Sequence, residues 1–264
     1  PGVDAISFTG STEVGKIVMR EAADTLKKVS LELGGKSPNV VFADADMAAA
    51  VRGANTGIFY GKGEVCAAGS RVLVEASVYE EFIDGLSARA DRATVGDPMD
   101  EKTRLGAIVS EAQLERVMGY INAGKSEGAR LVTGGDQVQV DGRGNFVQAT
   151  VFADVEADMA IAREEIFGPV AAVMPFEDID DAIAKANDTI FGLAAGVWTR
   201  DVGKAHRVAQ EIRAGTVWVN TYNQYDSASP FGGFKQSGFG RDLGLESALE
   251  KYTELKSVWV ALDG

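Results

Sequence analysis

Short β-rich runs alternate with segments of helical periodicity along nearly the whole chain of 264 residues, and this alternation limits the fold more than any other feature. The helical segments are roughly 10 to 15 residues long, the length that connects neighbouring parallel strands. The sequence therefore predicts an α/β fold with a mainly parallel sheet and flanking helices. Strands are expected at residues 4–8, 29–33, 39–42, 71–75, 170–176, 194–199, 215–220 and 254–262, and a strand pair at 129–135 and 144–152 around the turn DGRG.

Three polar residues mark helix starts. Asp46 is the expected N-cap of a helix that runs to about residue 59. Ser77 with Glu80, and Ser110 with Gln113, have the spacing of a capping box, and each pair predicts the start of a helix.

Charge and the scarcity of cysteine and histidine exclude several function classes. The net charge is −13, which disfavours binding to nucleic acid or to an anionic membrane surface. No apolar run approaches the ~18 residues of a membrane span. The single cysteine, Cys66, fits a reducing, cytoplasmic setting, and with the single histidine, His206, it cannot form a structural zinc site. His206 falls between the apolar positions of an amphipathic segment, so we expect it on a helix surface.

The stretch FTGSTEVGK places Gly10 and Ser11 between a strand and a helix start, where N–H groups can hold a phosphate. A P-loop needs Ser or Thr after its lysine, and here Ile17 follows Lys16, which disfavours that interpretation. A dinucleotide pyrophosphate site and an ordinary capped helix both remain open.

Two further residues are candidates for catalysis. Glu32 ends an apolar strand before two glycines, where partial burial can raise the pKa of a carboxylate toward that of a general base. The alternative is a solvated glutamate at the end of a strand. Cys66 lies in the glycine-rich stretch GKGEVCAAGS and is either a buried filler or a nucleophile. EEIFGPV and the long aromatic stretch 220–241 have the character of binding loops.

Five motifs in order, FTGSTEVG, LELGGKSP, GEVCAAGSR, EEIFGPV and SPFGGFKQSGFGR, resemble the NAD(P)-dependent aldehyde dehydrogenase superfamily, in its C-terminal catalytic portion. The resemblance implies an aldehyde dehydrogenase catalytic domain with a remnant of the Rossmann-like cofactor domain. It also implies that much of the cofactor-binding sheet precedes residue 1. The implied divisions are a dinucleotide-binding remnant at 1–34, a catalytic domain at 35–240, and a return to the cofactor domain with an oligomerisation strand at 241–264.

The resemblance also implies residue roles. Cys66 would be the nucleophilic thiol and Glu32 the general base that activates water. NAD or NADP would contact Gly10, Ser11, Val14, Leu33, Gly34, Glu165 and Phe167. The aldehyde would contact Asn220, Tyr222 and Phe231.

The implied reaction is oxidation of an aldehyde to a carboxylic acid through a thiohemiacetal and a thioester on Cys66, without a metal. The partners would be a small-molecule aldehyde and further copies of the chain, in a dimer or tetramer. Two alternatives are a non-catalytic homologue that folds and assembles, and an esterase that needs no cofactor.

The stretch departs from the family pattern at Glu64, where the family commonly has glutamine. A carboxylate two residues before the thiol would raise the pKa of Cys66 unless Lys62 or Arg71 offsets its charge.

Overall fold

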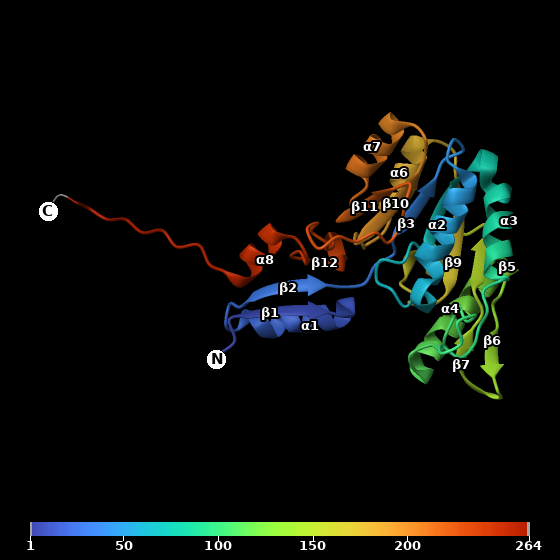
Figure 1. Ribbon diagram of the computed structural model, residues 1–264, viewed down its shortest axis with the longest axis horizontal. Helices are drawn as coiled ribbons and strands as arrows, with labels where there is room; N and C mark the ends of the chain where they lie inside the picture. Colours follow the sequence, from blue (N-terminus) through green and yellow to red (C-terminus); the bar gives the residue numbers. More distant parts are fainter. Residues whose placement is uncertain (1, 263–264) are drawn as a thin grey trace.

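A computed structural model describes residues 2–262 of the chain. Figure 1 shows a large α/β body, a smaller sheet beside it that carries the N-terminal segment, and a C-terminal tail that leads away from both. The predicted α/β class is confirmed, with mixed sheets and flanking helices.

The large body is built on a seven-stranded sheet. In spatial order its strands are β11 (Thr216–Val219), β10 (Ala194–Trp198), β3 (Pro38–Val41), β4 (Arg71–Glu75), β9 (Val170–Phe176), β8 (Thr150–Ala153) and β5 (Arg130–Thr133). All neighbouring pairs are parallel except β5 with β8. The central strands are buried on both faces, which explains why their sequences are continuous apolar runs.

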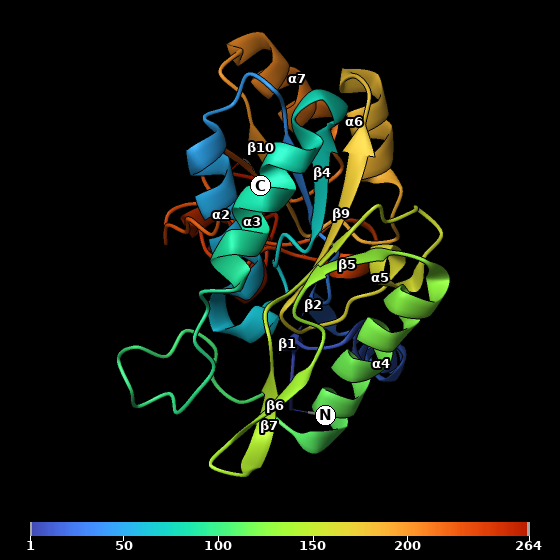
Figure 2. The ribbon, with the colours of Figure 1, turned by 90° about the vertical axis from the view of Figure 1, so that its right-hand side faces the viewer.

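Helices cover both faces of this sheet. Successive side chains of β3 belong to different cores, since Val40 packs in one apolar cluster and Val41 in the other. The Val41 cluster includes residues of α2 (Met47–Phe59) and α3 (Tyr79–Ala90). The Val40 cluster includes residues of α4 (Glu111–Glu127), α5 (Ala160–Arg163), α6 (Ile179–Asn187) and α7 (Val202–Glu211). Figure 2 shows α2 and α3 in front of the sheet, with the hairpin of β6 (Gln137–Val140) and β7 (Arg143–Val147) projecting from its lower end.

The smaller sheet has three strands, β1 (Ala5–Thr9), β2 (Lys28–Glu32) and β12 (Gly238–Phe239). Its helices are α1 (Thr12–Ala23) and α8 (Leu245–Tyr252). The chain leaves this sheet at the end of β2, enters the large sheet at β3, and returns at β12. The segment that joins β2 to β3 therefore lies at the junction of the two sheets, where the predicted catalytic residues gather.

Two of the three predicted helix caps have the expected geometry. The Asp46 side chain accepts a hydrogen bond from Ala49 N–H, and that of Ser110 accepts one from Gln113 N–H. The prediction at Ser77 is wrong, because a short 3₁₀ turn covers residues 76–78 and α3 begins at Tyr79 without a side-chain cap. The buried hydroxyl of Tyr79, the first residue of α3, donates to the Val173 carbonyl of β9 at 3.1 Å and ties this end of the helix to the sheet.

Two strand predictions also differ from the structure. The predicted pair is confirmed in part, because β5 in the first run pairs antiparallel with β8 at the end of the second. The difference is that residues 137–147 between them form a separate hairpin, β6–β7, around the turn. The expected strand at 254–262 is not formed in the described chain, where this stretch is exposed and lies beside no strand. His206 lies on the exposed face of α7, as predicted. None of the helices in the described part of the chain combines the length and apolar character needed to cross a membrane.

Candidate active site

Glu32 is the last residue of β2 and lies between Thr9 of β1 and Gly238 of β12. Only 5% of the residue is exposed, and neither carboxylate oxygen has a hydrogen-bond partner among the described residues. Burial, followed by the charge of Asp242, raises the pKa of Glu32 to about 7. A carboxylate that changes protonation near neutral pH, and that no neighbour binds, has the character of a general base.

The turn after Glu32 brings the two sheets and the Cys66 loop together. Leu33 donates its N–H to the Ser237 carbonyl at 3.0 Å, and Ser237 Oγ donates to the Gly34 carbonyl at 2.7 Å. A Cβ on Gly35 would lie only 2.5 Å from the carbonyl oxygen of Cys66. Glycine is therefore required at this contact, and it places the end of β2 directly against the loop of the cysteine.

Cys66 follows a sharply kinked segment at the end of α2. Gly61, Lys62 and Gly63 all have left-handed backbone angles, with φ of 58°, 63° and 72°. A Cβ on Gly63 would lie 2.1 Å from the Gly168 carbonyl oxygen, so the loop packs closely on the segment that follows Glu165. Cys66 itself is partly exposed.

Two carboxylates and two backbone amides change the pKa of the Cys66 thiol. Burial raises the pKa of the thiol, and the charges of Glu165 and Glu32 raise it further. The N–H groups of Ala67 and Cys66 oppose this shift. The structure thus brings the two predicted catalytic residues, Cys66 and Glu32, within electrostatic reach of each other.

Glu165 lies over the turn at residues 34–35. Its Oε1 accepts a hydrogen bond from Gly35 N–H at 3.1 Å, and a Cβ on Gly34 would meet Oε2 at 2.2 Å. Burial raises the pKa of Glu165, while the Gly35 N–H, Arg116 and Lys36 oppose this shift.

Two residues of α4 that the sequence did not identify hold the loop of Glu165 and Phe167. Gln113 Nε2 donates to the carbonyls of Ile166 and Phe167 at 3.0 and 2.8 Å. Arg116 donates to the Glu165 carbonyl at 3.1 Å. The capping signal at Ser110 predicted this helix. It did not predict the loop that the helix contacts, because the Gln113 bonds join residues 53 and 54 positions apart.

The turn between β1 and α1 lies beside the end of β2. Gly10 N–H donates to the Glu32 carbonyl at 3.1 Å, and Ser11 Oγ accepts from Val14 N–H at 3.3 Å as the N-cap of α1. Val14 is 42% exposed on the first turn. An exposed helix N-terminus with a capping hydroxyl, and a glutamate above a glycine cradle, suit the phosphates and the ribose hydroxyls of a dinucleotide. These residues fit a nicotinamide coenzyme.

The three predicted substrate residues lie in different settings. The Asn220 side chain pairs with both the N–H and the carbonyl of Thr199, at 3.0 and 2.9 Å. Tyr222 is 4% exposed, and its hydroxyl donates to the Ala67 carbonyl at 3.0 Å. Phe231 is half-buried. Tyr222 therefore contacts the Cys66 loop through a hydrogen bond. Contact of the three side chains with an aldehyde stays a prediction.

Tyr225 is a residue near the thiol that the sequence did not single out. Its ring packs against Trp218 and Phe231, with centroid distances of 5.5 and 5.4 Å. The residue is 51% exposed, so only its packed side is desolvated; this and the neighbouring Cys66 raise the pKa of Tyr225. Its place in the long aromatic stretch was the only available signal.

Glu64 is paired rather than free. Its carboxylate lies 2.9 Å from Lys62 Nζ and accepts a hydrogen bond from Val109 N–H at 3.0 Å. Arg71, the other cation considered from the sequence, is bound elsewhere, to the carbonyls of Lys185 and Ala186. Lys62 is therefore the residue that offsets the charge of Glu64.

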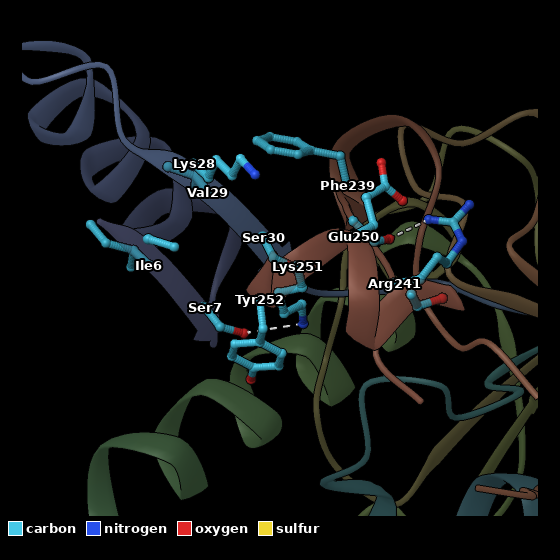
Figure 3. A pocket seen from close by; sticks show the side chains of 13 residues that line it. Ile6, Ser7, Lys28, Val29, Ser30, Phe239, Arg241, Glu250, Lys251 and Tyr252 are labelled. Atoms are coloured by element: carbon cyan, nitrogen blue, oxygen red, sulfur yellow. Dashed lines mark hydrogen bonds between the residues drawn. The ribbon is translucent and has the colours of Figure 1, made fainter. Parts of the chain in front are cut away.

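A cavity of about 710 Å³ opens beside β2 on the smaller sheet. Figure 3 shows its lining, which comes from β1, β2, α8 and the residues around Arg241. Within it Lys251 forms an ion pair with Asp242 and donates to Ser7 Oγ at 3.4 Å. Neither Cys66 nor Glu32 lines this cavity, so the candidate chemistry lies outside it. Residues 2–262 contain no cluster of acidic, cysteine and histidine side chains that could hold a metal ion.

Comparison with known proteins gives a consistent result. The sequence model of the aldehyde dehydrogenase family matches residues 1–258. Betaine aldehyde dehydrogenase of Rhizobium etli is 53% identical over 263 residues, which make up 99% of this chain and 54% of that protein. The chain spans about half the length of the curated relatives it matches.

Solved structures show the same similarity in three dimensions. The NAD⁺ complex of an aldehyde dehydrogenase from Bacillus cereus is 49% identical and superimposes with a TM-score of 0.96, over 99% of this chain and 52% of that chain. An NAD-dependent aldehyde dehydrogenase from Sinorhizobium meliloti is 43% identical with a TM-score of 0.97, over the same shares of the two chains.

Proposed function

The chain belongs to the aldehyde dehydrogenase family, and from this premise we propose that it oxidises an aldehyde to a carboxylic acid with a nicotinamide coenzyme. One observation carries the proposal. The carboxylate of Glu32 is buried with no hydrogen-bond partner among the described residues, its charge raises the pKa of the Cys66 thiol, and the turn that follows it touches the Cys66 backbone at Gly35. A base and a nucleophile placed in this way can form and then hydrolyse a thioester.

Cys66 has the role of nucleophile. Its thiolate attacks the aldehyde carbon, a C–S bond forms, and the carbonyl oxygen becomes the oxyanion of a thiohemiacetal. The backbone N–H of Cys66 would donate to that oxygen. Tyr222 binds the carbonyl of Ala67, which belongs to the following peptide, and would help to hold the loop.

Glu32 has the role of base in the second half of the reaction. It takes a proton from water, the resulting hydroxide adds to the thioester carbon, and the C–S bond breaks to release the acid and the thiolate. A pKa of about 7 leaves much of Glu32 ionised at neutral pH and still basic enough to accept a proton.

The coenzyme is NAD or NADP, and relatives solved with NAD⁺ support the first. When bound, it supplies the hydride acceptor that converts the thiohemiacetal into the thioester. Ser11 and Gly10 at the start of α1 would hold its phosphates, with Val14 near the adenine. Glu165 would bind the nicotinamide ribose, with Phe167, Leu33 and Gly34 beside it.

The remaining predictions belong to the same proposal. The substrate is a small aldehyde, and relatives named betaine aldehyde dehydrogenase support this class. The chain would act in the cytoplasm, in keeping with its single cysteine, and would assemble as a homo-oligomer, a dimer or tetramer. Ester hydrolysis without coenzyme is a second candidate activity, because it needs only Cys66 and Glu32.

Acylation by p-nitrophenyl acetate tests the nucleophile and the base separately from the coenzyme. Intact mass and peptide mapping should find a single acetyl group on Cys66 that forms and is then lost. Cys66→Ala should abolish this modification, and Glu32→Gln should leave acylation intact while the acetyl-enzyme accumulates, because water is no longer activated. Glu115→Gln, on the exposed side of α4, is the matched control and should behave as the unmodified chain.

Three results would contradict the proposal. Acetyl transfer that persists in Cys66→Ala would remove the nucleophile assignment. Loss of acylation itself in Glu32→Gln would show that Glu32 acts before the thioester forms. If acylation works but added NAD⁺ or NADP⁺ with an aldehyde yields no reduced coenzyme, the chain is an esterase and not a dehydrogenase.

A further inference from the structure

The loop of Cys66 is tied to α4 by a residue that departs from the family pattern, Glu64. The Glu64 side chain is only 8% exposed, and its two contacts are the Lys62 ammonium and the N–H of Val109. A buried carboxylate needs both a counter-charge and hydrogen bonds to be tolerated, and here it has one of each. The pair is therefore part of the packed structure and not a surface ion pair.

The backbone around this pair has little freedom of its own. Lys62 is one of the few residues other than glycine with a left-handed backbone angle, and it lies between two glycines that share this conformation. Such a segment keeps its shape only where contacts on both sides hold it. On one side Gly63 packs against the Gly168 carbonyl, and on the other Glu64 binds Val109.

Val109 connects this loop to the loop of Glu165. The next residue, Ser110, is the N-cap of α4, and its hydroxyl accepts from Gln113 N–H. The Gln113 side chain in turn donates to the carbonyls of Ile166 and Phe167, which follow Glu165. A continuous set of contacts thus runs from the residue two positions before the thiol to the glutamate over Gly34.

We propose that Glu64, neutralised by Lys62, is a positioning residue that anchors the Cys66 loop to the N-terminus of α4 and so sets the thiol relative to Glu165. The proposal rests on the nucleophilic role of Cys66. It has two consequences. The ammonium of Lys62 keeps the charge of Glu64 from acting on the thiol, and the pair keeps the amide of Val109 protected.

Charge matching can be tested with four variants and a control. Lys62→Met leaves the Glu64 charge uncompensated, Lys62→Met with Glu64→Gln removes both charges, and Lys62→Arg keeps the pair. Glu64→Gln alone keeps an oxygen that can accept from Val109. Arg207→Met breaks an exposed pair with Glu211 on α7 and is the matched control.

Alkylation of Cys66 by iodoacetamide, followed by intact mass across a pH series, reports on the thiol whether or not the chain turns over an aldehyde. Lys62→Met should move the midpoint of the profile upward by about half a unit, which slows alkylation about threefold below the midpoint, because only the thiolate reacts. The double variant and Lys62→Arg should return to within about twofold of the unmodified rate. The other ionisable groups near the thiol, Glu32, Glu165 and Tyr225, are the same in all variants.

Hydrogen exchange tests the anchoring. In Lys62→Met, peptides covering residues 60–70 and 106–112 should exchange faster, by about tenfold, while peptides over α6 and α7 stay unchanged. The double variant should recover protection, because the neutral amide at position 64 can stay buried and still accept from Val109. Glu64→Ala, which removes the acceptor, should lose protection at 106–112 whatever residue is at position 62.

The proposal is overturned if Lys62→Met has the alkylation profile and exchange pattern of Arg207→Met, or if the double variant is no closer to the unmodified chain than Lys62→Met. If Lys62→Met fails to fold by circular dichroism, Lys62→Arg and Glu64→Ala carry the test through exchange at 106–112. Failure of the proposed enzyme function would appear differently, as normal alkylation in every variant without any acyl transfer.

Discussion

Glu32 couples the chemistry of the candidate site to the stability of the fold. Its carboxylate is buried without a hydrogen-bond partner, and its pKa is raised to about 7 from an ordinary value of 4.5. The folded chain therefore binds a proton on Glu32 more tightly than the unfolded chain does. This tighter proton binding stabilises the folded chain. The stabilisation is complete below the pKa of Glu32 in the unfolded chain, and it is lost as the pH rises through about 7.

We expect Glu32→Gln to change the pH dependence of stability. The variant has no charge to bury, so its stability relative to the unmodified chain should grow between about pH 5 and pH 8, by roughly 3 kcal/mol at most. Urea unfolding at several pH values measures this difference. Glu115→Gln should show no such trend. If the unfolding free energies of Glu32→Gln and the unmodified chain changed with pH in parallel, Glu32 would not be a buried group with a raised pKa.

At the scale of elements, contacts between loops place the working groups. The turn after β2 meets the Cys66 loop at Gly35, that loop meets Gly168 at Gly63, and Tyr222 supports it from below. Each contact joins segments from different elements of the fold. Short glycine contacts of this kind leave no room for a side chain, which makes them sensitive to the smallest substitution.

Gly35→Ala should disrupt this arrangement. The added methyl would lie 2.5 Å from the Cys66 carbonyl oxygen, which is backbone and can move only with its loop. We expect a loss of stability of about 1–3 kcal/mol and at least about tenfold slower acylation of Cys66. Both are measured on one preparation, by thermal unfolding and by p-nitrophenyl acetate.

Gly119→Ala is the control for this substitution. Gly119 lies on the exposed side of α4, and an added Cβ there would have no neighbour within 4 Å. The change should stabilise the chain by up to about 1 kcal/mol, because alanine favours a helix, and should leave acylation alone. Equal effects of the two variants on acylation would show that the Gly35 contact does not position the thiol.

At the scale of the whole molecule, the C-terminal segment is held to the described chain at its start, where Lys28 donates to the Thr253 carbonyl at 2.9 Å and pairs with Glu254, and it leads away from the fold beyond that point. Residues 253–262 are exposed, and several of them are large and apolar, including Leu255, Val258 and Trp259. A run of exposed apolar residues marks an interaction site. This fits the oligomerisation strand implied by the family resemblance, which stays a prediction.

Removal of residues 254–264 should separate assembly from folding. We expect the shortened chain to keep its thermal midpoint to within a few degrees, on the order of 1 kcal/mol, because these residues add little to the core. Its mass in solution, measured by light scattering after gel filtration, should fall from that of a dimer or tetramer to a smaller species. An unchanged mass would assign assembly to another surface.

Much of the architecture was accessible from local pattern. Apolar runs such as those of β3 and β9 are long enough to identify buried strands, and the caps at Asp46 and Ser110 depend on bonds only three residues apart. The start of α3 did not follow the serine signal, because α3 begins at Tyr79 with no side-chain cap. The pairing of β5 with β8 was expected from the two runs around the turn, but the separate hairpin β6–β7 between them was not.

The same division holds at the candidate site. The residues alone left Cys66 as either a buried filler or a nucleophile, and the roles of Glu32, Cys66 and Glu165 came from the order of the five motifs, which resembles the family; these roles stay predictions. The burial that raises the pKa of Glu32, the hold of Gln113 on the Glu165 loop and the pairing of Glu64 with Lys62 appear only in the folded chain. The reason is physical: the kinds of reaction open to a side chain follow from its residue type, whereas its pKa, and with it its reactivity, depends on groups that are distant in sequence and adjacent only after folding.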